Sequence, residues 1–312
     1  MKALQYKNYG GSAVLEINEV EKPIVGKGQV LIEVHAASIN PFDYKLRLGY
    51  MKDGMPLQFP FTIGGDLSGV VTAVGEEVNN FKIGDEVFGQ SYNFGGSSGS
   101  MAQFAAANID SIAQKPANID HNQAASLPLV GSSAIQALED HMNLQSGQKI
   151  LIHGGAGGIG SIAIQLAKHL GAYVATTASA KDIDFVKGLG ADKVIDYTQE
   201  KFEEKLSGFD AVYDTVDGDT TERSFKVLKK RGILVSMLGK PSEELAVEYG
   251  VTVVGQGTKT DSEHLTKLAQ LIEQGAIKPQ VDKIFPFEQS RAAFEYAENN
   301  HPRGKVVIKI ND

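Results

Sequence analysis

A glycine-rich run at residues 150–160 carries the clearest chemical signal in the sequence. It reads Ile-Leu-Ile-His-Gly-Gly-Ala-Gly-Gly-Ile-Gly, and three of its glycines fall at the spacing G-x-G-x-x-G. That spacing permits a tight turn, a close approach of backbone to phosphate, and close packing of a helix on a strand. A flexible loop is the alternative, but residues 149–153 predict a strand and residues 161–170 a helix. We therefore predict that a dinucleotide pyrophosphate binds at this helix N-terminus, held by Gly155, Ala156, Gly157, Gly158, Ile159 and Gly160.

The end of the next predicted strand indicates which dinucleotide binds. An acid about 20 residues beyond the glycines accepts hydrogen bonds from the ribose of NAD, but this chain has Thr177 there. Ser179 and Lys181 add a hydroxyl and a cation that suit a ribose 2′-phosphate. We predict NADP(H) as the cofactor, with Thr177, Ser179 and Lys181 beside it. The alternative for Lys181 is a solvated surface lysine, and Asp182 weakens the positive field, so we expect an incomplete preference over NAD(H).

The composition excludes several classes of protein. The 312 residues carry 38 acidic and 30 basic side chains, and the net charge of −8 disfavours a binder of nucleic-acid phosphates. No cysteine is present, which excludes disulfides, thiolate catalysis and cysteine-bound zinc. The length predicts about two domains, and we see no apolar stretch long enough for a signal peptide or a membrane span. We expect a cytoplasmic protein with a small-molecule substrate and neither nucleic acid nor membrane as partner.

The chain has two parts that differ in their pattern of predicted secondary structure. The first part is rich in short predicted strands and glycine turns, at 14–20, 29–37, 67–74 and 85–89. From residue 123, predicted strands (149–153, 173–177, 193–195, 210–214, 232–237, 251–254) alternate with predicted helices (133–141, 161–170, 181–189, 200–206, 219–228). This alternation predicts a doubly wound parallel sheet. The tail has predicted helices at 261–273 and 288–298, and its final strand, 305–310, is expected to join the N-terminal sheet. Residues 95–100, rich in Gly and Ser, predict a mobile loop or, alternatively, a lid.

Six segments in a fixed order carry a family resemblance. They read S-I-N-P-F-D-Y-K-L-R-L-G (38–49), I-G-G-D-L-S-G-V-V (63–71), K-I-G-D-E-V-F-G (82–89), A-A-S-L-P-L-V-G-S-S-A (124–134), H-G-G-A-G-G-I-G (153–160) and R-G-K-V-V-I (303–308). Together they resemble the medium-chain dehydrogenase/reductase superfamily, within it the zinc-free quinone oxidoreductase (zeta-crystallin-like) branch. The resemblance implies an α/β fold with an NADP(H)-binding Rossmann domain at 126–257 and a GroES-like, partly barrel-shaped β domain at 1–125 and 258–312. It also implies a homodimer joined through edge strands of the nucleotide domain, here 232–237 and 251–254.

The positions that align with zinc ligands in the zinc alcohol dehydrogenases hold other residues here. Asn40 replaces a cysteine, and Gly65 followed by Asp66 replaces a histidine-glutamate pair. The third ligand falls near residues 127–129, which are apolar or proline, and the four-cysteine lobe is reduced to residues 95–100. The seven histidines show no paired ligand spacing. A catalytic zinc needs about three protein ligands, so we predict no metal.

Candidate catalytic residues come from the same resemblance. It implies that Asn40 lies beside nicotinamide and substrate, where its amide could polarise a carbonyl oxygen; the alternative is a turn residue before Pro41. Tyr50 could line the acceptor pocket or donate a proton, or it could be a surface tyrosine. Asp43 is expected to be structural, paired with Arg47 or capping the turn.

Further cofactor contacts are predicted where parallel strands end, because ligands bind at that edge of open α/β sheets. Tyr197 could cover the 2′-phosphate, as in relatives, although a tyrosine of the strand edge is the alternative. The complete set of these candidates is Ser133, Tyr197, Thr215, Val216, Leu238 and Gly239.

These features predict an NADPH-dependent, zinc-independent reductase that transfers hydride to a quinone or similar electron-poor carbonyl acceptor in an interdomain cleft. Hydride transfer from nicotinamide depends mainly on alignment, because the cofactor already carries the reactive hydride. An enone or 2-alkenal reductase is the nearest alternative. A non-catalytic NADPH-binding redox sensor or interaction protein is the third.

Overall fold

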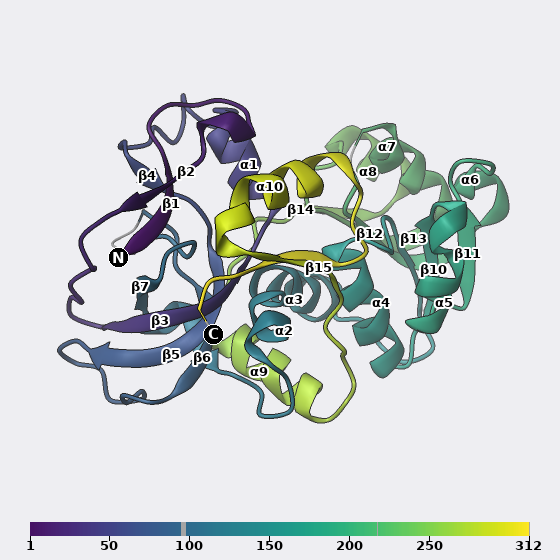
Figure 1. Ribbon diagram of the computed structural model, residues 1–312. Coiled ribbons are helices and arrows are strands. Elements are labelled where there is room, and N and C mark those ends of the chain that lie inside the picture. The colour runs from purple at the N-terminus through teal and green to yellow at the C-terminus, as the bar shows by residue number, and fades with distance from the viewer. Residues whose placement is uncertain (95–97, 217, 312) are drawn as a thin grey trace. The chain divides into compact units, whose positions relative to one another are not determined.

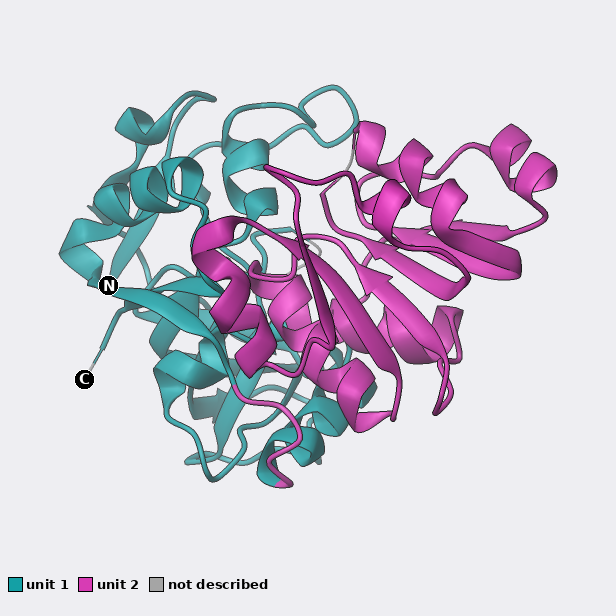
Figure 2. Cartoon of the chain, turned by 90° about the vertical axis from the view of Figure 1, so that its right-hand side faces the viewer, with its two compact units in different colours: residues 1–129, 260–273, 279–312 teal, residues 130–259, 274–278 magenta. Residues whose placement is uncertain are grey.

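The structure of the protein is a computed structural model that describes residues 1–94, 98–216 and 218–311. The chain divides into two compact units (Figure 2). Unit 1 comprises Met1–Leu129, Thr260–Glu273 and Pro279–Asp312, and unit 2 comprises Val130–Lys259 and Gln274–Lys278. The predicted loop at 95–100 falls partly outside the described residues, since 95–97 are not among them.

Unit 1 is built around the long strand β3 (Gln29–Ser38), which pairs antiparallel with β5 (Asp66–Val74) (Figure 1). β3 is buried along most of its length and β5 over its first four residues, and their inward valines, leucines and isoleucines form one core. The sheet runs β15 (Val281–Pro286), β16 (Lys305–Lys309), β3, β5, β6 (Glu86–Gln90), β8 (Ile112–Gln114), with β7 (Phe104–Asn108) also on β3. A smaller sheet has the order β2 (Glu16–Glu19), β1 (Lys2–Tyr6), β4 (Phe61–Thr62).

The last strand of the chain joins this N-terminal sheet, as predicted. β16 pairs antiparallel with β3, with Val307 opposite Ser38. The consequence is that residues near 305 lie beside residues near 40. The helices of unit 1 are α1 (Pro41–Arg47), α2 (His121–Ala125), α9 (Ser262–Glu273) and α10 (Ser290–Asn299).

Unit 2 contains, within the described residues, one parallel sheet in the order β11 (Lys193–Asp196), β10 (Tyr173–Ala178), β9 (Lys149–Ile152), β12 (Phe209–Asp214), β13 (Leu228–Ser236), β14 (Thr252–Gly255). Numbered within the unit this order is 3-2-1-4-5-6, the doubly wound order of dinucleotide-binding domains, so the predicted fold class is confirmed. Its helices are α3 (Pro128–Ile135), α4 (Gly158–His169), α5 (Ile183–Gly188), α6 (Phe202–Lys205), α7 (Asp219–Ser224) and α8 (Glu243–Tyr249).

Local predictions differ from the structure in several places, and three of these differences have a clear local reason. The predicted strand at 14–20 begins only at Glu16, because residues 12–14 form a 3-10 turn. The predicted helix at 133–141 is the end of α3 followed by a π-helical segment, Gln136–His141. The prediction omitted α8, although its signals are in the sequence: Ser242 caps its start and Gly250, in a left-handed conformation, ends it.

Candidate functional site

The glycine turn joins β9 to α4 at the carboxyl edge of the unit 2 sheet. Gly154 has φ +70 and starts the turn, and Gly157 precedes the first helical residue. The backbone N–H of Gly155 donates to the carbonyl of Thr177, which ties the turn to β10. A helix leaves the N–H groups of its first turn without intrahelical acceptors, and no acidic side chain lies in the first turn of α4. The turn therefore presents backbone donors to an anion.

The glycines of the motif have different roles. A Cβ added at Gly155 would lie 2.1 Å from the Thr176 hydroxyl oxygen, and one at Gly160 would lie 2.2 Å from the carbonyl oxygen of Gly154. Both glycines are therefore required for packing of the helix on the strand. At Gly157 the nearest atom of the described residues to an added Cβ is the same carbonyl oxygen at 3.4 Å, so this side of the turn is open to a ligand. The cradle fits a dinucleotide pyrophosphate.

Thr177 faces into unit 2, where it organises the turn. Its hydroxyl oxygen accepts from the N–H of Gly154 at 3.2 Å and lies 3.1 Å from His153 Nδ1. The other ring nitrogen of His153 lies 3.0 Å from the hydroxyl of Ser224 on α7. Burial lowers the pKa of His153 to about 4, although Asp214 opposes the shift, so the ring is neutral at pH 7. The predicted ribose contact of Thr177 stays a prediction.

The other predicted cofactor residues of unit 2 lie where the strands end. Ser179 follows β10 and its hydroxyl donates to Asp182, Lys181 is exposed, and Tyr197 follows β11 with 61% of its surface exposed. After β12, the Thr215 hydroxyl donates to the carbonyl of His153 at 2.8 Å, and Val216 is half exposed. Leu238 and Gly239 follow β13, and among the described residues no atom lies within 4 Å of a Cβ added at Gly239. Because all six strands are parallel, these residues share one edge of the sheet with the glycine turn.

Ser133 is placed differently from the rest of this set. It is fully buried on α3, and its hydroxyl lies 2.7 Å from that of Thr258. Its carbonyl accepts from Tyr213 and Gln256. These contacts hold α3 within unit 2, so contact of Ser133 with a cofactor stays a prediction.

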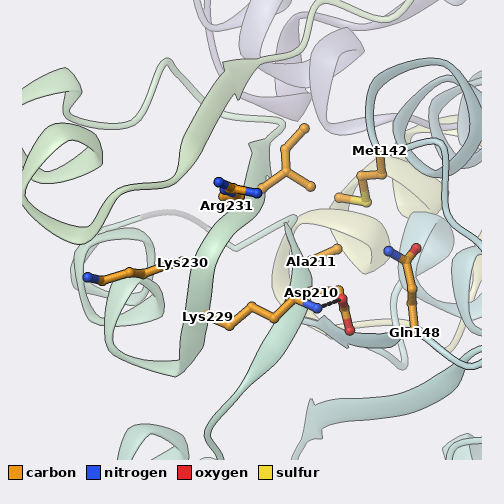
Figure 3. Close-up of a pocket in the computed structure, with 8 residues that line it drawn as sticks. Met142, Gln148, Asp210, Ala211, Lys229, Lys230 and Arg231 are labelled. Carbon is orange, nitrogen blue, oxygen red and sulfur yellow. Dashed lines mark ion pairs between the residues drawn. The ribbon is translucent and has the colours of Figure 1, made fainter.

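A hollow of about 470 Å³ in unit 2 lies at the opposite end of the strands (Figure 3). Its lining includes Asp210 at the start of β12 and Lys229, Lys230 and Arg231 at the start of β13. Lys229 pairs with Asp210. Since the glycine turn follows the carboxyl end of β9, this basic hollow does not belong to the candidate nucleotide site.

In unit 1, Asn40 is the centre of a buried polar cluster. Its amide nitrogen donates to Asp66 Oδ2 at 2.9 Å, and its amide oxygen accepts from the ammonium of Lys305. Lys305 also donates to the carbonyl of Ile39 at 2.7 Å and lies 3.6 Å from Asp66. Asp66 accepts further from Ser38 and Gln90. Asn40 and Asp66 are fully buried, and polarisation of a substrate carbonyl by Asn40 stays a prediction.

This cluster does not offer a zinc site. Apart from the Asp66 carboxylate, the side chains that meet there are the Asn40 and Gln90 amides, the Ser38 hydroxyl and the Lys305 ammonium, whereas zinc is held by thiolates, imidazoles and carboxylates. Among the described residues, no group of three or more His, Cys, Asp or Glu side chains could hold a metal ion. The Lys305 ammonium supplies the positive charge that balances Asp66.

Asp43 caps α1, which is one of the two structural roles predicted for it. Its Oδ2 accepts from the backbone N–H of Asn40 at 2.7 Å. The predicted pairing of Asp43 with Arg47 was wrong, because Arg47 forms an ion pair with Glu298 of α10 at 2.9 Å. Burial raises the pKa of Asp43 to about 7, and the nearby Asp66 carboxylate adds to the shift.

Two tyrosines of unit 1, Tyr50 and Tyr92, differ in environment. Tyr50, the predicted acceptor-pocket residue, follows α1 and is 73% exposed. Tyr92, which sequence reasoning missed, is half-buried, and burial raises its pKa well above 10. Its ring packs on Gly65, where an added Cβ would lie 2.1 Å from a ring carbon. No local motif marks Tyr92; a glycine at a position that carries a bulky ligand in zinc enzymes was the available hint.

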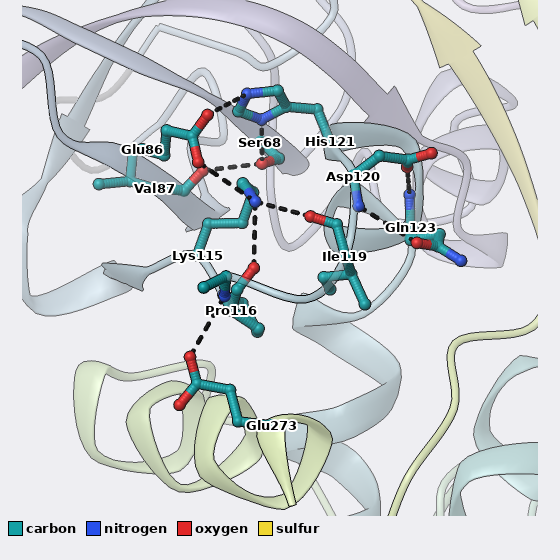
Figure 4. Close-up of polar contacts among 11 residues, drawn as sticks. Ser68, Glu86, Val87, Lys115, Pro116, Ile119, Asp120, His121, Gln123 and Glu273 are labelled. Atoms are coloured by element: carbon teal, nitrogen blue, oxygen red, sulfur yellow. Dashed lines mark hydrogen bonds and ion pairs between the residues drawn. The ribbon is translucent and has the colours of Figure 1, made fainter. Parts of the chain in front are cut away.

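A second polar cluster in unit 1 joins α2 to the sheet (Figure 4). The His35 and His121 rings stack with centroids 4.4 Å apart, and His121 Nδ1 lies 2.8 Å from the Ser68 hydroxyl. The other ring nitrogen of His121 lies 3.5 Å from Glu86. Ser68 is fully buried and donates to the carbonyl of Val87, so this serine-histidine-glutamate series fixes α2 rather than exposing a nucleophile. Burial lowers the pKa of His121 to about 4.

Two known families match the chain. The alcohol dehydrogenase GroES-like domain family matches residues 26–117, and the zinc-binding dehydrogenase family matches residues 189–308.

No helix of the described part of the chain is long and apolar enough to cross a membrane.

Relatives match over the whole chain. The 2-methylene-furan-3-one reductase of Solanum lycopersicum is 40% identical over 99% of this chain and 79% of its own length. The chloroplastic NADPH-dependent alkenal/one oxidoreductase of Arabidopsis thaliana is 39% identical with the same coverage. The solved structure of the quinone oxidoreductase from Coxiella burnetii has 36% identity and a TM-score of 0.90, covering 100% of this chain and 99% of that one. The chain therefore belongs to the medium-chain dehydrogenase/reductase superfamily of oxidoreductases, among relatives of the quinone oxidoreductase and alkenal reductase type.

Proposed function

We propose that the protein reduces electron-poor conjugated carbonyl compounds, with quinones as the first candidate acceptors. The single observation that carries this proposal is the glycine turn before α4, whose open side and backbone donors suit a dinucleotide. The cofactor is NADP(H). When bound, NADPH supplies the hydride that such acceptors take.

The residues proposed to hold the cofactor belong to unit 2. The backbone of residues 155–160 would bind the pyrophosphate, and Ser179, Lys181 and Tyr197 would surround the adenosine 2′-phosphate. Lys181 supplies the positive charge expected for a phosphate, and Ser179 and Tyr197 supply hydroxyls. Thr215, Val216, Leu238 and Gly239 would continue the site along the same sheet edge.

Reduction of an enone C=C bond is the second candidate activity. It is favoured by the two relatives with the highest identity quoted above, whose names are a 2-methylene-furan-3-one reductase and an alkenal/one oxidoreductase. Both candidates place negative charge on a carbonyl oxygen as hydride arrives. They differ in the final proton, since an enone needs one at its α-carbon.

An acceptor panel tests these activities. Purified protein is mixed with NADPH and a quinone, a 2-alkenal, an enone or a saturated ketone, and loss of reduced-nicotinamide absorbance is followed. We expect consumption with the quinone and the unsaturated carbonyls and little with the saturated ketone. Product analysis then separates C=C reduction from C=O reduction. Tight NADPH binding without consumption for any acceptor would support the non-catalytic sensor instead.

Assembly and location are further proposals. The strand β14 pairs with β13 at one edge of the unit 2 sheet, and an edge strand can pair with its copy in a second chain. We expect a homodimer by sedimentation, and a monomer at all concentrations would contradict this. The cytoplasmic location predicted from the sequence stays a prediction.

A further inference from the structure

Thr177 accepts hydrogen bonds from two consecutive N–H groups at the start of the glycine turn. Its hydroxyl oxygen accepts from Gly154 at 3.2 Å, and its carbonyl oxygen accepts from Gly155 at 3.0 Å. Thr177 itself is buried at the end of β10. One residue of β10 therefore fixes both glycines, and with them the point at which the chain turns toward α4.

The hydrogen bonds beyond Thr177 have a direction that follows from the far end of the series, on α7. The Ser224 hydroxyl lies 2.7 Å from the carbonyl oxygen of Thr220. A carbonyl oxygen can only accept, so the single hydrogen of Ser224 is directed there. Ser224 must then accept from His153 Nε2, which lies 3.0 Å away. The Nε2 atom of His153 therefore carries a hydrogen.

The other ring nitrogen of His153 is an acceptor. Burial lowers the pKa of His153 to about 4, so at pH 7 the ring is neutral and has one N–H. Since that hydrogen is on Nε2, the Thr177 hydroxyl donates to Nδ1, 3.1 Å away. The series thus runs in one direction from the Gly154 N–H through Thr177, His153 and Ser224 to the carbonyl of Thr220.

The His153 ring is also held by its other neighbours. The ring is buried, and the Phe202 ring meets it edge-on at a centroid distance of 4.6 Å. The Thr215 hydroxyl donates to the backbone carbonyl of His153 at 2.8 Å. A buried polar network whose members are all satisfied is rigid. The Thr177 hydroxyl therefore keeps its hydrogen on His153 and has none to give a ribose.

We propose that His153 and Thr177 are positioning residues, which hold the glycine turn in the conformation that receives the NADPH pyrophosphate through a directed hydrogen-bond series with His153 in its Nε2–H form. The inference rests on the proposed function and deepens it, because it names what supports the cofactor site. Thr177 then acts on the cofactor through the turn, in place of the ribose contact predicted from its position in the sequence.

Removal of the Thr177 hydroxyl tests the proposal. Thr177→Val keeps the side-chain shape, and we expect NADPH affinity to fall roughly threefold to tenfold, the effect of one hydrogen bond. Thr177→Ser keeps a hydroxyl and is expected to restore most of that affinity. The matched control is Thr176→Val, which removes a buried hydroxyl that donates to the carbonyl of Ile152 in β9 at 2.7 Å. We expect the control to bind NADPH as the parent does, and equal losses in the two valine variants would overturn the proposal.

A second ligand separates an effect on the turn from a contact with the ribose. The probe 2′-AMP carries the adenosine ribose and its 2′-phosphate but no pyrophosphate. We expect Thr177→Val to bind 2′-AMP with the parent affinity, measured by calorimetry. A fall as large as that for NADPH would overturn the proposal and assign Thr177 to the ribose.

The coupling of the two residues is tested by a double variant. Thr177→Val and His153→Phe break the same series, so we expect the double variant to lose no more NADPH affinity than the weaker-binding single variant. Losses that multiply would mean that the two residues act separately, against the proposal. These are binding measurements, so a parent that binds NADPH but reduces no acceptor would contradict only the proposed function.

The protonation of the ring is measured on the unaltered protein, whether or not the variants fold. Nitrogen-15 NMR of the imidazole rings at about pH 7 distinguishes a ring nitrogen that carries hydrogen from one that does not, and the His153→Phe spectrum assigns the signals. We expect the hydrogen of His153 on Nε2. A hydrogen on Nδ1 would reverse the series, free the Thr177 hydrogen and overturn the proposal.

Discussion

The candidate nucleotide site of unit 2 and the polar cluster of unit 1 are built in opposite ways. The glycine turn consists of backbone from consecutive residues, supported by Thr177 only 23 positions from Gly154. The cluster consists of side chains, and its ammonium comes from Lys305, 265 positions from Asn40. A backbone site depends on the absence of side chains, whereas a side-chain site depends on distant strands meeting in register. The two sites should therefore respond differently to substitution.

The largest expected effect is loss of the charge balance in unit 1. Lys305→Met leaves the fully buried Asp66 without its cation, and removal of one partner of a buried pair costs about 3–5 kcal/mol. We expect that decrease in the free energy of unfolding, measured by urea denaturation. Lys309→Met, on the exposed end of the same strand, is the control and is expected to change stability by less than about 0.5 kcal/mol.

A second variant separates charge from packing. Lys305→Met combined with Asp66→Asn removes both charges, so we expect much of the lost stability to return. No recovery would mean that Lys305 acts mainly through its packing and its bond to Ile39, and that the stability of the unit 1 cluster does not depend on charge balance.

The difference between local and distant contacts also explains which features could be predicted from the sequence. The strand, turn and helix around Gly155 are local, so residue spacing predicted them, and the alternation of strands and helices predicted the sheet. The return of the last strand to the first domain was also predicted, but its consequence was not, because no local pattern says that Lys305 meets Asn40. One of the two roles predicted for Asp43 was an ion pair with Arg47, four residues away, but Arg47 pairs with Glu298, 251 positions away.

We also expect the two units to differ in how pH changes their contribution to the free energy of unfolding. Burial raises the pKa of Asp43 from 3.8 to about 7, so between those values the folded chain holds a proton that the unfolded chain has lost. The stability due to that proton is present below about pH 4 and is lost as pH rises through 7. Burial lowers the pKa of His153 from 6.5 to about 4. The stability that the neutral ring contributes is therefore present above about pH 6.5 and is lost as pH falls toward 4.

Two variants measure these opposite trends. Relative to the parent, Asp43→Asn is expected to gain stability as pH rises from about 4 to 7, and His153→Gln as pH falls from about 6.5 to 4. The gain is on the order of 1 kcal/mol per pH unit within each window. Urea denaturation of both variants at about pH 5 and about pH 7 checks the signs, and trends of the same sign would contradict the assignment.

A smaller effect distinguishes the glycines of unit 2. Gly160→Ala would bring a Cβ to 2.2 Å from the Gly154 carbonyl oxygen, so we expect a loss of about 1–3 kcal/mol in stability together with weaker NADPH binding. Gly157→Ala meets nothing closer than 3.4 Å and is expected to fold normally, yet to bind NADPH more weakly because its methyl faces the ligand. Thermal denaturation and NADPH titration of both variants test this. Unchanged NADPH affinity in Gly157→Ala would show that the open side of the turn is not where the cofactor lies.

The smallest expected effect concerns the preference for NADPH. Lys181 is exposed, and an exposed charge contributes little, about 1 kcal/mol or less. Lys181→Ala is therefore expected to weaken NADPH binding by roughly twofold to fivefold at low salt and to leave NADH binding unchanged, because only NADPH has the 2′-phosphate. Lys187→Ala, an exposed lysine on α5, is the matched control and should affect neither cofactor. An equal loss of affinity for NADPH and NADH would mean that Lys181 does not contact the 2′-phosphate and only adds positive charge to unit 2. Ser179 and Tyr197 would then be the remaining candidates for the phosphate contact.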